Sequence, residues 1–465
     1  MRKKLITLIL LILGFVTSVN AEGISFKQVG RIKPRHANQI RSSNWSVGAE
    51  TMDRDYTIYR NWKDYLRPLG IKKARIQGGW AKTEKRKGVY DFNWLDEIIF
   101  DMDDQGVEPW MCLCYGNSLY SDGGGVRLGA QIPSSEKSLR AWTQWVRAVV
   151  SRYMDVIDEW EIWNEPNLRK ANVAKNYACF MLHTAENIRK IQPDAKILTM
   201  STAGVDTKFV REVLEIAKQQ NKLHLIDQVT YHPYSHNPDK SYKAVDGLRR
   251  IVKDFSARIT IRQGENGCPS MRRKTKALRD YDWTEVSQAK WALRRLLGDL
   301  GRDIESSYFA IMDMKYPDEM NVKGLLKSRE NQTVEYTKPS YHAAQNLASV
   351  FDDRLTRIKN FRYTADTEKS LSVFAYKNGQ TGTHIVTMWF GGENPSDNNT
   401  LNNIDFTLMN VRFEQPVYID LRTGVVYEIP KSIYSKVGDK YIFHAVPCYD
   451  SPILIADQDC IYLQK

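Results

Sequence analysis

Two glutamates in this 465-residue chain stand at the ends of apolar segments. Glu165 follows the run from Val156 to Trp163, and Glu265 follows the run from Ile259 to Gly264. Pro166 cannot extend a strand, so the chain must turn there and leave Glu165 at the strand tip. Glycines on both sides of Glu265 let the backbone bend and a ligand approach closely. Two carboxyl groups about 5 Å apart are what glycoside hydrolysis with retention requires, one as nucleophile and one as proton donor.

Each glutamate also has a structural explanation. Asn and Glu are common at helix starts, so Glu165 could simply cap the next helix. For an isolated Asn-Glu-Pro that explanation would be preferred. The flanking Trp160 and Trp163, together with a second strand that also ends in Glu, favour a site instead.

The segments that must position these glutamates alternate between short apolar runs and longer amphipathic stretches, as βα units do. Eight such runs predict a (β/α)8 TIM barrel, in which active-site groups lie at the carboxyl ends of the strands. Strands four and seven, which carry Glu165 and Glu265, then face each other across the mouth. The eight predicted strands are Trp45–Glu50, Lys73–Gln77, Glu108–Cys114, Val156–Trp163, Lys196–Ser201, Gln228–His232, Arg258–Gly264 and Ser306–Met312.

The pattern changes near residue 350, where short alternating runs separated by turn residues replace the long helices. This pattern predicts an antiparallel β-sandwich appended to the barrel, an overall α/β fold. The predicted division is a barrel over residues 44–349 and a sandwich over residues 350–465. Residues 22–43 are ambiguous and are a candidate for an added sandwich strand.

The first residues are typical of a signal peptide. Arg2, Lys3 and Lys4 precede an apolar run from Leu5 to Val19, and small residues follow where a peptidase would cleave, so residues 1–21 are predicted to be removed. No cysteine follows that point and no later run is long enough to span a membrane. The sequence therefore predicts a secreted or periplasmic protein without a lipoprotein anchor.

The charge and the cysteines limit which ligands and cofactors the protein is expected to bind. The net charge of +12 is scattered rather than clustered, which argues against a nucleic-acid partner and leaves an acidic glycan open. None of the six cysteines has metal-site spacing with histidine partners. Neither a metal nor an organic cofactor is expected, because two carboxyl groups suffice for glycoside hydrolysis. Cys448 and Cys460 could form a disulfide after export, whereas Cys112 and Cys114 should not pair with each other.

The chain resembles the clan A glycoside hydrolases, and within them glycoside hydrolase family 39. The strand-four signature Glu-x-Trp-Asn-Glu-Pro-Asn is matched from Glu161 to Asn167, and the strand-seven Glu-x-Gly by Glu265 and Gly267. The resemblance covers residues 44–350. It implies that Glu165 is the general acid/base, that Glu265 is the nucleophile and that Asn164 holds the sugar 2-hydroxyl.

The resemblance also implies three further site residues. Arg75 matches the arginine that lies beside the nucleophile, and His232 and Tyr234 match a His-x-Tyr pattern on strand six. Two of the three have an alternative explanation: Arg75 as an ion-pair partner in the barrel, and His232 as a buried core histidine.

Three aromatic residues at or near the rim strands, Trp80, Trp110 and Tyr115, are candidates for stacking on sugars or for core packing.

Two departures from the family separate this chain from its β-xylosidases and α-L-iduronidases. Gly264 stands where the family has Thr or Ser before the nucleophile. The end of strand eight, Ala310 to Lys315, has no tryptophan to floor the reactive subsite.

The expected function is a retaining glycoside hydrolase acting on a plant, algal or host polysaccharide or oligosaccharide. Three other hypotheses remain open: an endo-acting glycanase of a neighbouring clan A family, a non-catalytic carbohydrate-binding barrel, and a surface protein whose function lies in the sandwich. The sugar, the linkage and the oligomeric state are not predicted.

Overall fold

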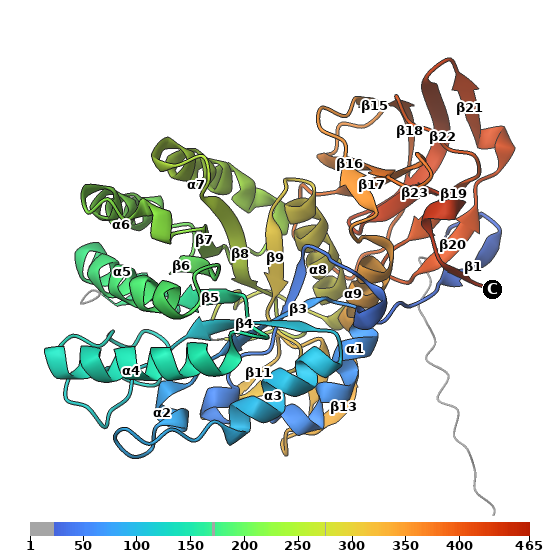
Figure 1. The fold of residues 1–465 in the computed structure, drawn as a ribbon. Coiled ribbons are helices and arrows are strands. Elements are labelled where there is room, and N and C mark those ends of the chain that lie inside the picture. The colour runs from blue at the N-terminus through green and yellow to red at the C-terminus, as the bar shows by residue number, and fades with distance from the viewer. Residues whose placement is uncertain (1–22, 170–172, 275) are drawn as a thin grey trace, which may run out of the picture.

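The computed structural model describes residues 23–169, 173–274 and 276–465, so the predicted signal segment lies outside the described residues. Eight parallel strands close into a barrel (Figure 1). With the C-terminal antiparallel sheets, this confirms the predicted fold. The barrel strands are β2 (Trp45–Gly48), β3 (Lys73–Gln77), β4 (Glu108–Leu113), β5 (Glu159–Ile162), β6 (Lys196–Ala203), β7 (Gln228–His232), β8 (Thr260–Asn266) and β9 (Glu305–Tyr308).

Helices surround the barrel (Figure 1). Side-chain caps mark the start of three of the described helices: Ser135 accepts a hydrogen bond from the Ser138 amide, Asp206 from the Phe209 amide and Thr284 from the Ser287 amide. The short helices are α1 (Leu66–Leu69) and α2 (Trp80–Thr83). The long ones are α3 (Asn93–Asp104), α4 (Glu136–Tyr153), α5 (Ala174–Ile191), α6 (Thr207–Gln219), α7 (Tyr242–Phe255), α8 (Glu285–Leu300) and α9 (Pro339–Val350).

The last barrel strand is shorter than predicted. β9 ends at Tyr308 rather than at Met312, although the Phe309 amide still bonds to the Asn266 carbonyl of β8 and the Ile311 amide to the Gly48 carbonyl of β2. Two small antiparallel pairs follow, β10 (Met314–Lys315) with β11 (Met320–Asn321), and β12 (Leu326–Ser328) with β13 (Val334–Thr337).

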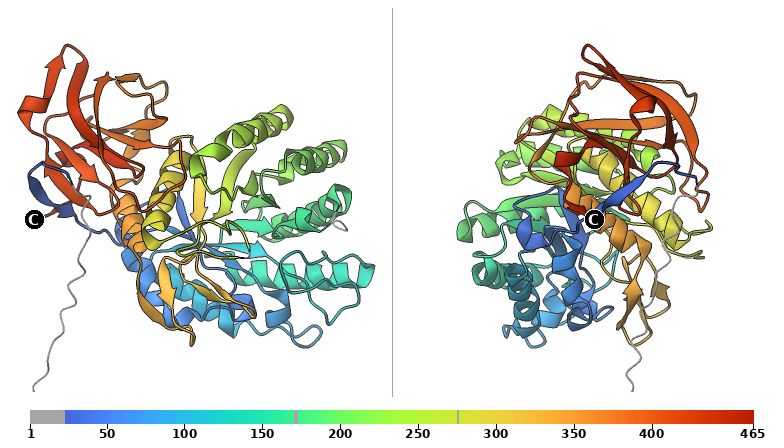
Figure 2. Two further views of the ribbon diagram at one scale, coloured as in Figure 1. Left: turned by 180° about the vertical axis from the view of Figure 1, so that it is seen from behind. Right: turned by 90° about the vertical axis from the view of Figure 1, so that its right-hand side faces the viewer.

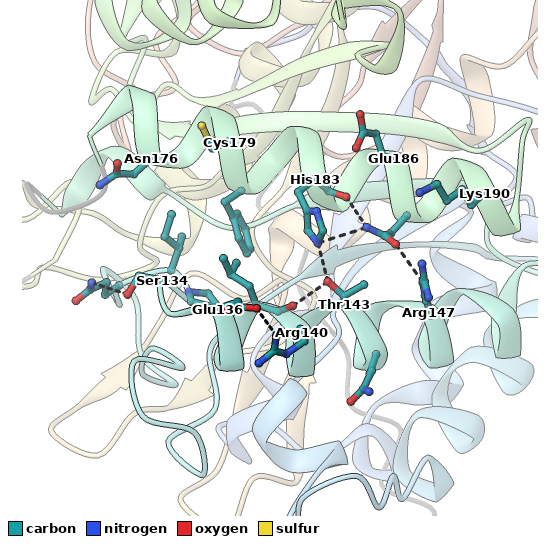
Figure 3. A pocket seen from close by; sticks show the side chains of 17 residues that line it. Ser134, Glu136, Arg140, Thr143, Arg147, Asn176, Cys179, His183, Glu186 and Lys190 are labelled. Carbon is teal, nitrogen blue, oxygen red and sulfur yellow. Dashed lines mark hydrogen bonds and ion pairs between the residues drawn. The ribbon is translucent and has the colours of Figure 1, made fainter. Parts of the chain in front are cut away.

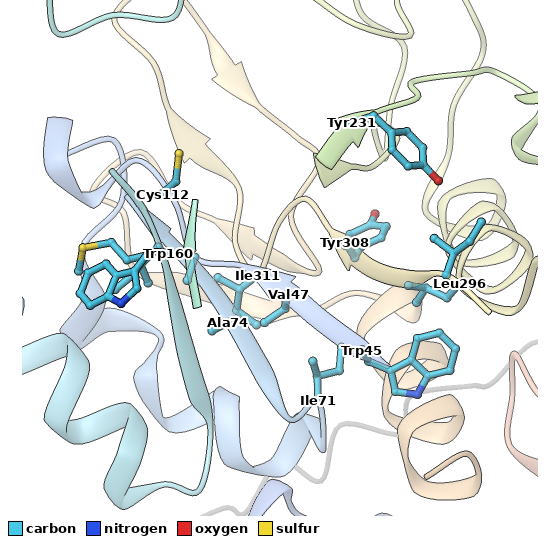
Figure 4. Close-up of a cluster of buried hydrophobic side chains, with 14 of the residues drawn as sticks. Trp45, Val47, Ile71, Ala74, Cys112, Trp160, Tyr231, Leu296, Tyr308 and Ile311 are labelled. Atoms are coloured by element: carbon cyan, nitrogen blue, oxygen red, sulfur yellow. The ribbon is translucent and has the colours of Figure 1, made fainter. Parts of the chain in front are cut away.

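Alternate strand residues face opposite sides of the barrel wall. Apolar side chains such as Trp45, Val47 and Ala74 belong to the buried cluster in Figure 4. The intervening side chains are polar or charged, among them Ser46, Lys73 and Arg75. The barrel interior is therefore unusually rich in groups that can hold charges in place.

A layer of ion pairs fills the barrel below the mouth. Glu159 bonds Arg262 at 2.6 Å and Lys73 at 2.9 Å, and Glu305 bonds Arg262 at 2.9 Å. Burial acts to raise the pKa of Glu305, but Arg262 and Lys196 outweigh it and lower that pKa to about 2. Glu159 and Glu305 each pair with more than one cation, so the layer can hold fixed the side chains that lie nearer the barrel mouth.

The C-terminal region forms two antiparallel sheets. The larger one includes β1, from the N-terminal segment whose pairing the sequence left open. Its strands, in spatial order, are β14 (Leu355–Arg357), β16 (Leu371–Asn378), β17 (His384–Phe390), β23 (Ile453–Asp457), β19 (Pro416–Asp420), β20 (Val425–Glu428), β1 (Gln28–Ile32) and β24 (Leu463–Gln464). The smaller sheet contains β15 (Tyr363–Ala365), β18 (Asn402–Met409), β22 (Lys440–Cys448) and β21 (Tyr434–Val437).

The larger sheet is buried on both faces. Ile385 and Trp389 of β17 belong to the core that extends into the barrel, whereas Val386 and Met388 pack in the sandwich core. This explains why every residue of β17 is buried. The sandwich sits beside α8 and α9, on the side of the barrel away from α4 and α5 (Figures 1 and 2).

All six cysteines are free thiols. The disulfide that the sequence allows between Cys448 and Cys460 is not formed; the Cys460 thiol contacts the Thr383 hydroxyl at 3.3 Å. Cys112 and Cys114 lie with their Sγ atoms 3.6 Å apart and remain unbonded, as their spacing predicts. In the part of the chain that the structure describes, no helix is long and apolar enough to cross a membrane.

Candidate active site

A cavity of 640 Å³ opens at the carboxyl ends of the barrel strands. Its wall comes from the segments that follow β2, β3, β4, β5, β8 and β9. The residues lining it are Thr51, Arg54, Tyr56, Gln77, Tyr115, Arg127, Leu128, Gly129, Asn164, Leu168, Glu265, Lys276, Phe309, Tyr316, Pro317 and Asp318. The structure therefore brings segments from most of the barrel sequence to one concave face.

Glu265 lies near the end of β8 with 12% of its side chain exposed. The Tyr234 hydroxyl donates to its Oε1 at 2.8 Å, and Arg75 Nη1 donates to its Oε2 at 3.0 Å. A carboxylate with a donor on each oxygen is stabilised in its ionised form. This is the state in which a glutamate can act as a nucleophile.

Glu165 follows β5 in a left-handed backbone conformation, with φ of 49°. Such conformations are costly for residues other than glycine and concentrate at functional sites. Glu165 Oε1 lies 2.8 Å from His232 Nδ1, and His232 Nε2 lies 3.0 Å from the Ser201 hydroxyl. The carboxyl group is thus held by a histidine whose own orientation is set from the neighbouring strand.

His232 is completely buried at the end of β7. Burial acts to lower its pKa, but the negative charges of Glu265 and Glu165 outweigh it, and the pKa is raised. The histidine therefore favours holding a proton between the two glutamates. A histidine that bonds to Glu165 and lies near Glu265 belongs to the site, and the alternative of a histidine that only packs in the core does not describe it.

The two glutamates face each other. One carboxylate oxygen of Glu165, one of Glu265 and one ring nitrogen of His232 all lie within 4.8 Å of one another. Retaining glycosidases hold their two carboxyl groups about 5 Å apart, whereas inverting enzymes leave room for a water at larger separation. The spacing here matches the retaining arrangement.

Arg75 connects the site residues. Its Nε donates to Glu161 Oε2 at 2.9 Å, and its Nη2 donates to Asn164 Oδ1 at 2.7 Å. Asn164 in turn donates from Nδ2 to the Tyr115 hydroxyl at 2.9 Å. Arg75 is both an ion-pair partner in the barrel and a neighbour of Glu265, so the two explanations offered by the sequence hold together.

The sequence reasoning missed several residues of this network. Glu50, Glu161 and Ser201 each contact Arg75, and Thr230 donates to Glu161 Oε1 at 2.6 Å. A signal for Glu50 was present, because it too is a glutamate at the end of a predicted strand. Glu161 was noted as part of the strand-four signature without a role.

Two of the three predicted sugar-stacking aromatic residues are core residues, which corrects that expectation. Trp110 is 1% exposed and lies inside the barrel, with Arg75 and Arg262 over its ring at 5.5 and 5.0 Å. Trp80 is 0% exposed and stacks on the Tyr120 ring. Neither offers a face to a ligand. Tyr115 does line the cavity.

Replacing Trp80 by phenylalanine tests this correction. The indole Nε1 donates to Glu84 Oε2 at 2.6 Å, and losing this buried bond is expected to lower the free energy of unfolding by about 1–3 kcal/mol. The Michaelis constant should not change. Urea denaturation of Trp80→Phe measures the free energy of unfolding, and steady-state kinetics measures the Michaelis constant. Tyr115→Phe, which removes a hydroxyl at the cavity wall, is the matched variant and is expected to lower kcat/KM. An increased Michaelis constant for Trp80→Phe with unchanged stability would restore the sugar-stacking role.

The departure at Gly264 has a steric reason. A Cβ at this position would lie 3.3 Å from His232 Nε2 and 3.3 Å from Thr230 Cβ. A Ser or Thr would therefore require the histidine to move.

Although no tryptophan follows strand eight, other aromatic residues line the cavity wall. Tyr56 and Tyr316 line it with their ring centroids 4.9 Å apart, and the Arg54 guanidinium lies 5.3 Å from the Tyr56 ring.

The donor atoms of Glu165, His232 and Glu265 also lie close enough together to hold a metal ion. In the structure these atoms are engaged with one another and with Arg75 and Tyr234. Carboxylate, imidazole and guanidinium groups arranged in this way suffice for acid/base and nucleophilic chemistry.

A larger cavity, of 810 Å³, lies between α4 and α5 on the outside of the barrel (Figure 3). Several of its polar groups bond to each other: the Thr143 hydroxyl lies 2.7 Å from His183 Nε2, and Arg147 Nε donates to Asn187 Oδ1 at 3.0 Å. Of the two glutamates that line it, Glu136 pairs with Arg140 and Glu186 pairs with Lys222. The candidate active site is therefore the smaller cavity at the mouth.

Comparison with known proteins agrees with this geometry. Residues 52–252 match the model of glycosyl hydrolases family 39. A family 39 glycoside hydrolase from Bacteroides cellulosilyticus WH2 has a similar structure, with a TM-score of 0.64, 19% identity, and coverage of 91% of this chain and 81% of that one. A monomeric β-xylosidase from Caulobacter crescentus CB15 has a TM-score of 0.59 at 15% identity, covering 92% and 97% of the two chains.

A curated relative, the β-galactosidase bgaB of Geobacillus kaustophilus, is 31% identical over 116 residues, which span 22% of this chain and 16% of that enzyme. The similarity to the solved structures extends through both the barrel and the sandwich, because it covers nine-tenths of the chain. Over residues 52–252 the chain is similar to family 39 glycosyl hydrolases, and it shares its fold with solved enzymes of that family.

Proposed function

We propose that this protein hydrolyses glycosidic bonds with retention, using Glu265 as nucleophile and Glu165 as general acid/base. The observation that carries the proposal is the pair of carboxyl groups facing each other within 4.8 Å, one held by Arg75 and Tyr234 and the other by His232. Glu265 lies beside a guanidinium group and a phenol, whereas Glu165 lies beside an imidazole. A nucleophile and a general acid need different environments of this kind.

In the first step Glu265 attacks the anomeric carbon while Glu165 protonates the departing oxygen. In the second step water attacks the glycosyl-enzyme, and Glu165 acts as base. His232 positions Glu165 through Nδ1, and Arg75 positions Glu265 together with Asn164. Asn164 lines the cavity, where it can reach a sugar hydroxyl.

The substrate is proposed to be a polysaccharide or oligosaccharide of plant, algal or host origin, met outside the cytoplasm. Support for export is the basic and then apolar character of residues 1–21. Arg54, Arg127 and Lys276 line the cavity, so uronic and sulfated sugars belong in any test.

A panel of glycans and aryl glycosides tests the proposal, run on wild type beside Glu265→Ala with released sugars identified by mass. It begins with β-xylosides and β-galactosides, which the similar proteins' names suggest, and includes α-L-iduronides. Release by wild type alone is the expected result. Equal release by both proteins would remove Glu265 from the chemistry, and binding without release by either would favour a carbohydrate-binding barrel.

Replacing Glu165 by glutamine is expected to act selectively on leaving groups. Poor leaving groups need the proton, so kcat/KM for an alkyl or sugar leaving group should fall by about 10²–10⁴. For a dinitrophenyl glycoside of the same sugar the fall should be far smaller, because that leaving group departs unprotonated. The two substrates control for each other, and an equal loss for both would show that Glu165 is not the acid.

A further inference from the structure

A third carboxyl group lies beside the nucleophile. Glu50 follows β2, is 2% exposed, and accepts a hydrogen bond from Arg75 Nη1 to its Oε1 at 3.1 Å. The same nitrogen donates to Glu265 Oε2 at 3.0 Å. Nη1 carries two N–H groups, so Glu50 and Glu265 each accept one of them and share the charge of one guanidinium group.

The second oxygen of Glu50 is unpaired among the described residues. Glu50 Oε2 is buried and accepts no hydrogen bond from that part of the chain, which is costly for a carboxylate and less costly for a neutral acid. Gly48 makes room for it, because a Cβ at that position would lie 2.2 Å from Glu50 Oε2. Burial raises the pKa of Glu50 to about 7; Arg75 acts to lower it and the charge of Glu265 to raise it further.

The other carboxyl group on Arg75 is ionised. Burial acts to raise the pKa of Glu161, but the charge of Arg75 outweighs it and the pKa is lowered. Glu161 and Glu265 bring two carboxyl groups to the single guanidinium group of Arg75, and His232 Nδ1 lies 3.8 Å from Glu265 Oε2. Glu50 is thus the carboxyl group whose ionisation depends on whether Glu265 carries its charge.

We propose that Glu50 is a positioning residue that keeps its proton while Glu265 is a carboxylate and releases it when Glu265 becomes the glycosyl ester. The inference rests on the proposed function. Glu50 would then supply the negative charge that Arg75 loses in the covalent intermediate.

Atoms and charge are conserved in both steps of the reaction. One oxygen of Glu265 forms a bond to the anomeric carbon, the bond to the leaving oxygen breaks with its electron pair, and the Glu165 proton goes to that oxygen. Glu265 becomes a neutral ester, and the Glu50 proton passes to solvent in the cavity, which the adjacent Thr51 lines. When water attacks, Glu265 leaves as a carboxylate and Glu50 takes up a proton again.

Arg75 on β3 and Glu265 on β8 are the charges that act on Glu50 directly. Tyr234 and Tyr316 also interact with it, but burial raises the pKa of Tyr316 to about 12 and that of Tyr234 well above its usual value. Two further groups interact with Glu265: His232, 3.8 Å away, and Lys323, whose pKa burial lowers to about 7. Of the charges that act on Glu50 directly, that of Glu265 is the one that the reaction removes and restores.

Infrared titration of protonated carboxyl groups tests this coupling without any substrate. Wild type should lose a buried carboxylic-acid band with a midpoint near pH 7. Glu50→Gln should lack that band, and Glu165→Gln, which removes the proton of the general acid, should keep it. In Glu265→Gln, where the nucleophile's charge is absent as in the ester, the midpoint should fall by at least one pH unit. Glu161→Gln is the matched control on the same arginine and should remove no band near pH 7.

An unchanged midpoint in Glu265→Gln would overturn the proposal, as would the absence of a band near pH 7 in wild type. The comparison of wild type with Glu265→Gln stays decisive even where Glu50→Gln does not fold. The infrared result is independent of the test of the proposed function, which asks whether wild type releases sugar from the panel.

Kinetics on a substrate from that panel separates this role from a purely structural one. In Glu50→Gln, kcat/KM, which reports the first step, should fall about tenfold, the factor that one pKa unit represents. With a substrate whose second step is rate-limiting, kcat should not fall, because a neutral residue 50 favours the return of charge to Glu265. Equal losses in both constants would show a structural role only and overturn the proposal.

Discussion

Replacing Glu265 by alanine is expected to lower kcat by a factor on the order of 10⁵, because the variant lacks the group that forms the covalent intermediate. The fold should persist, since the side chain is partly exposed and lies at the mouth. Steady-state kinetics with an activated aryl glycoside measures the loss, and circular dichroism with thermal unfolding confirms the fold.

Added azide sharpens this prediction. The small anion fits the space left by the carboxylate and should restore part of the activity, giving a glycosyl azide whose configuration is inverted relative to the substrate. Wild type under the same conditions should give no such product. Turnover of Glu265→Ala at the wild-type rate, or an azide product of retained configuration, would remove Glu265 as the nucleophile.

Replacing Arg75 by methionine is expected to reduce both stability and activity. The change leaves the completely buried Glu161 without its cationic partner and removes a donor from Glu265. Breaking a buried ion pair from one side typically costs about 3–5 kcal/mol. Lysine cannot replace the planar group that reaches three carboxyl groups at once, so Arg75→Lys should recover only part of the loss.

The pH dependence of this loss follows from Glu161. Its pKa is lowered in the folded protein, so its pairing with Arg75 contributes stability above its unfolded pKa and loses that contribution as the pH falls. The stability difference between wild type and Arg75→Met should therefore be largest near pH 7 and shrink towards pH 4. Urea denaturation across this range measures it.

Arg262→Met is the matched control for Arg75. Arg262 is also buried, also lies against Trp110, and pairs with Glu159 and Glu305 in the layer below. Its loss should cost stability of similar size while the folded protein keeps its kcat/KM. Equal catalytic defects in the two variants would mean that Arg75 acts only through the fold.

The barrel was predictable because the strands are short apolar runs bounded by turn residues, and each of the eight runs became a strand. The same reasoning located Glu165 and Glu265, since a carboxyl group that ends a parallel strand must lie at the mouth. It passed over Glu50, although Glu50 ends the first predicted strand in the same way. That residue's environment, shared with Arg75, depends on register between strands distant in sequence.

The aromatic residues show the limit of sequence reasoning most clearly. Trp110 is paired with Arg75 in the register between β3 and β4, which places its ring inside the barrel between two arginines. Position along a strand does not reveal which side of the wall a side chain faces. Tyr56 and Tyr316 reach the cavity from loops, whose paths no periodic pattern predicts.

The central claim is that the two facing glutamates act by double displacement, and the configuration of the first product tests it most directly. Proton NMR during the earliest turnovers of a glycoside from the panel observes the anomeric signal before the released sugar equilibrates. Retention of the substrate's configuration is the predicted result. Release of the inverted anomer would show that water attacks directly and would contradict the account.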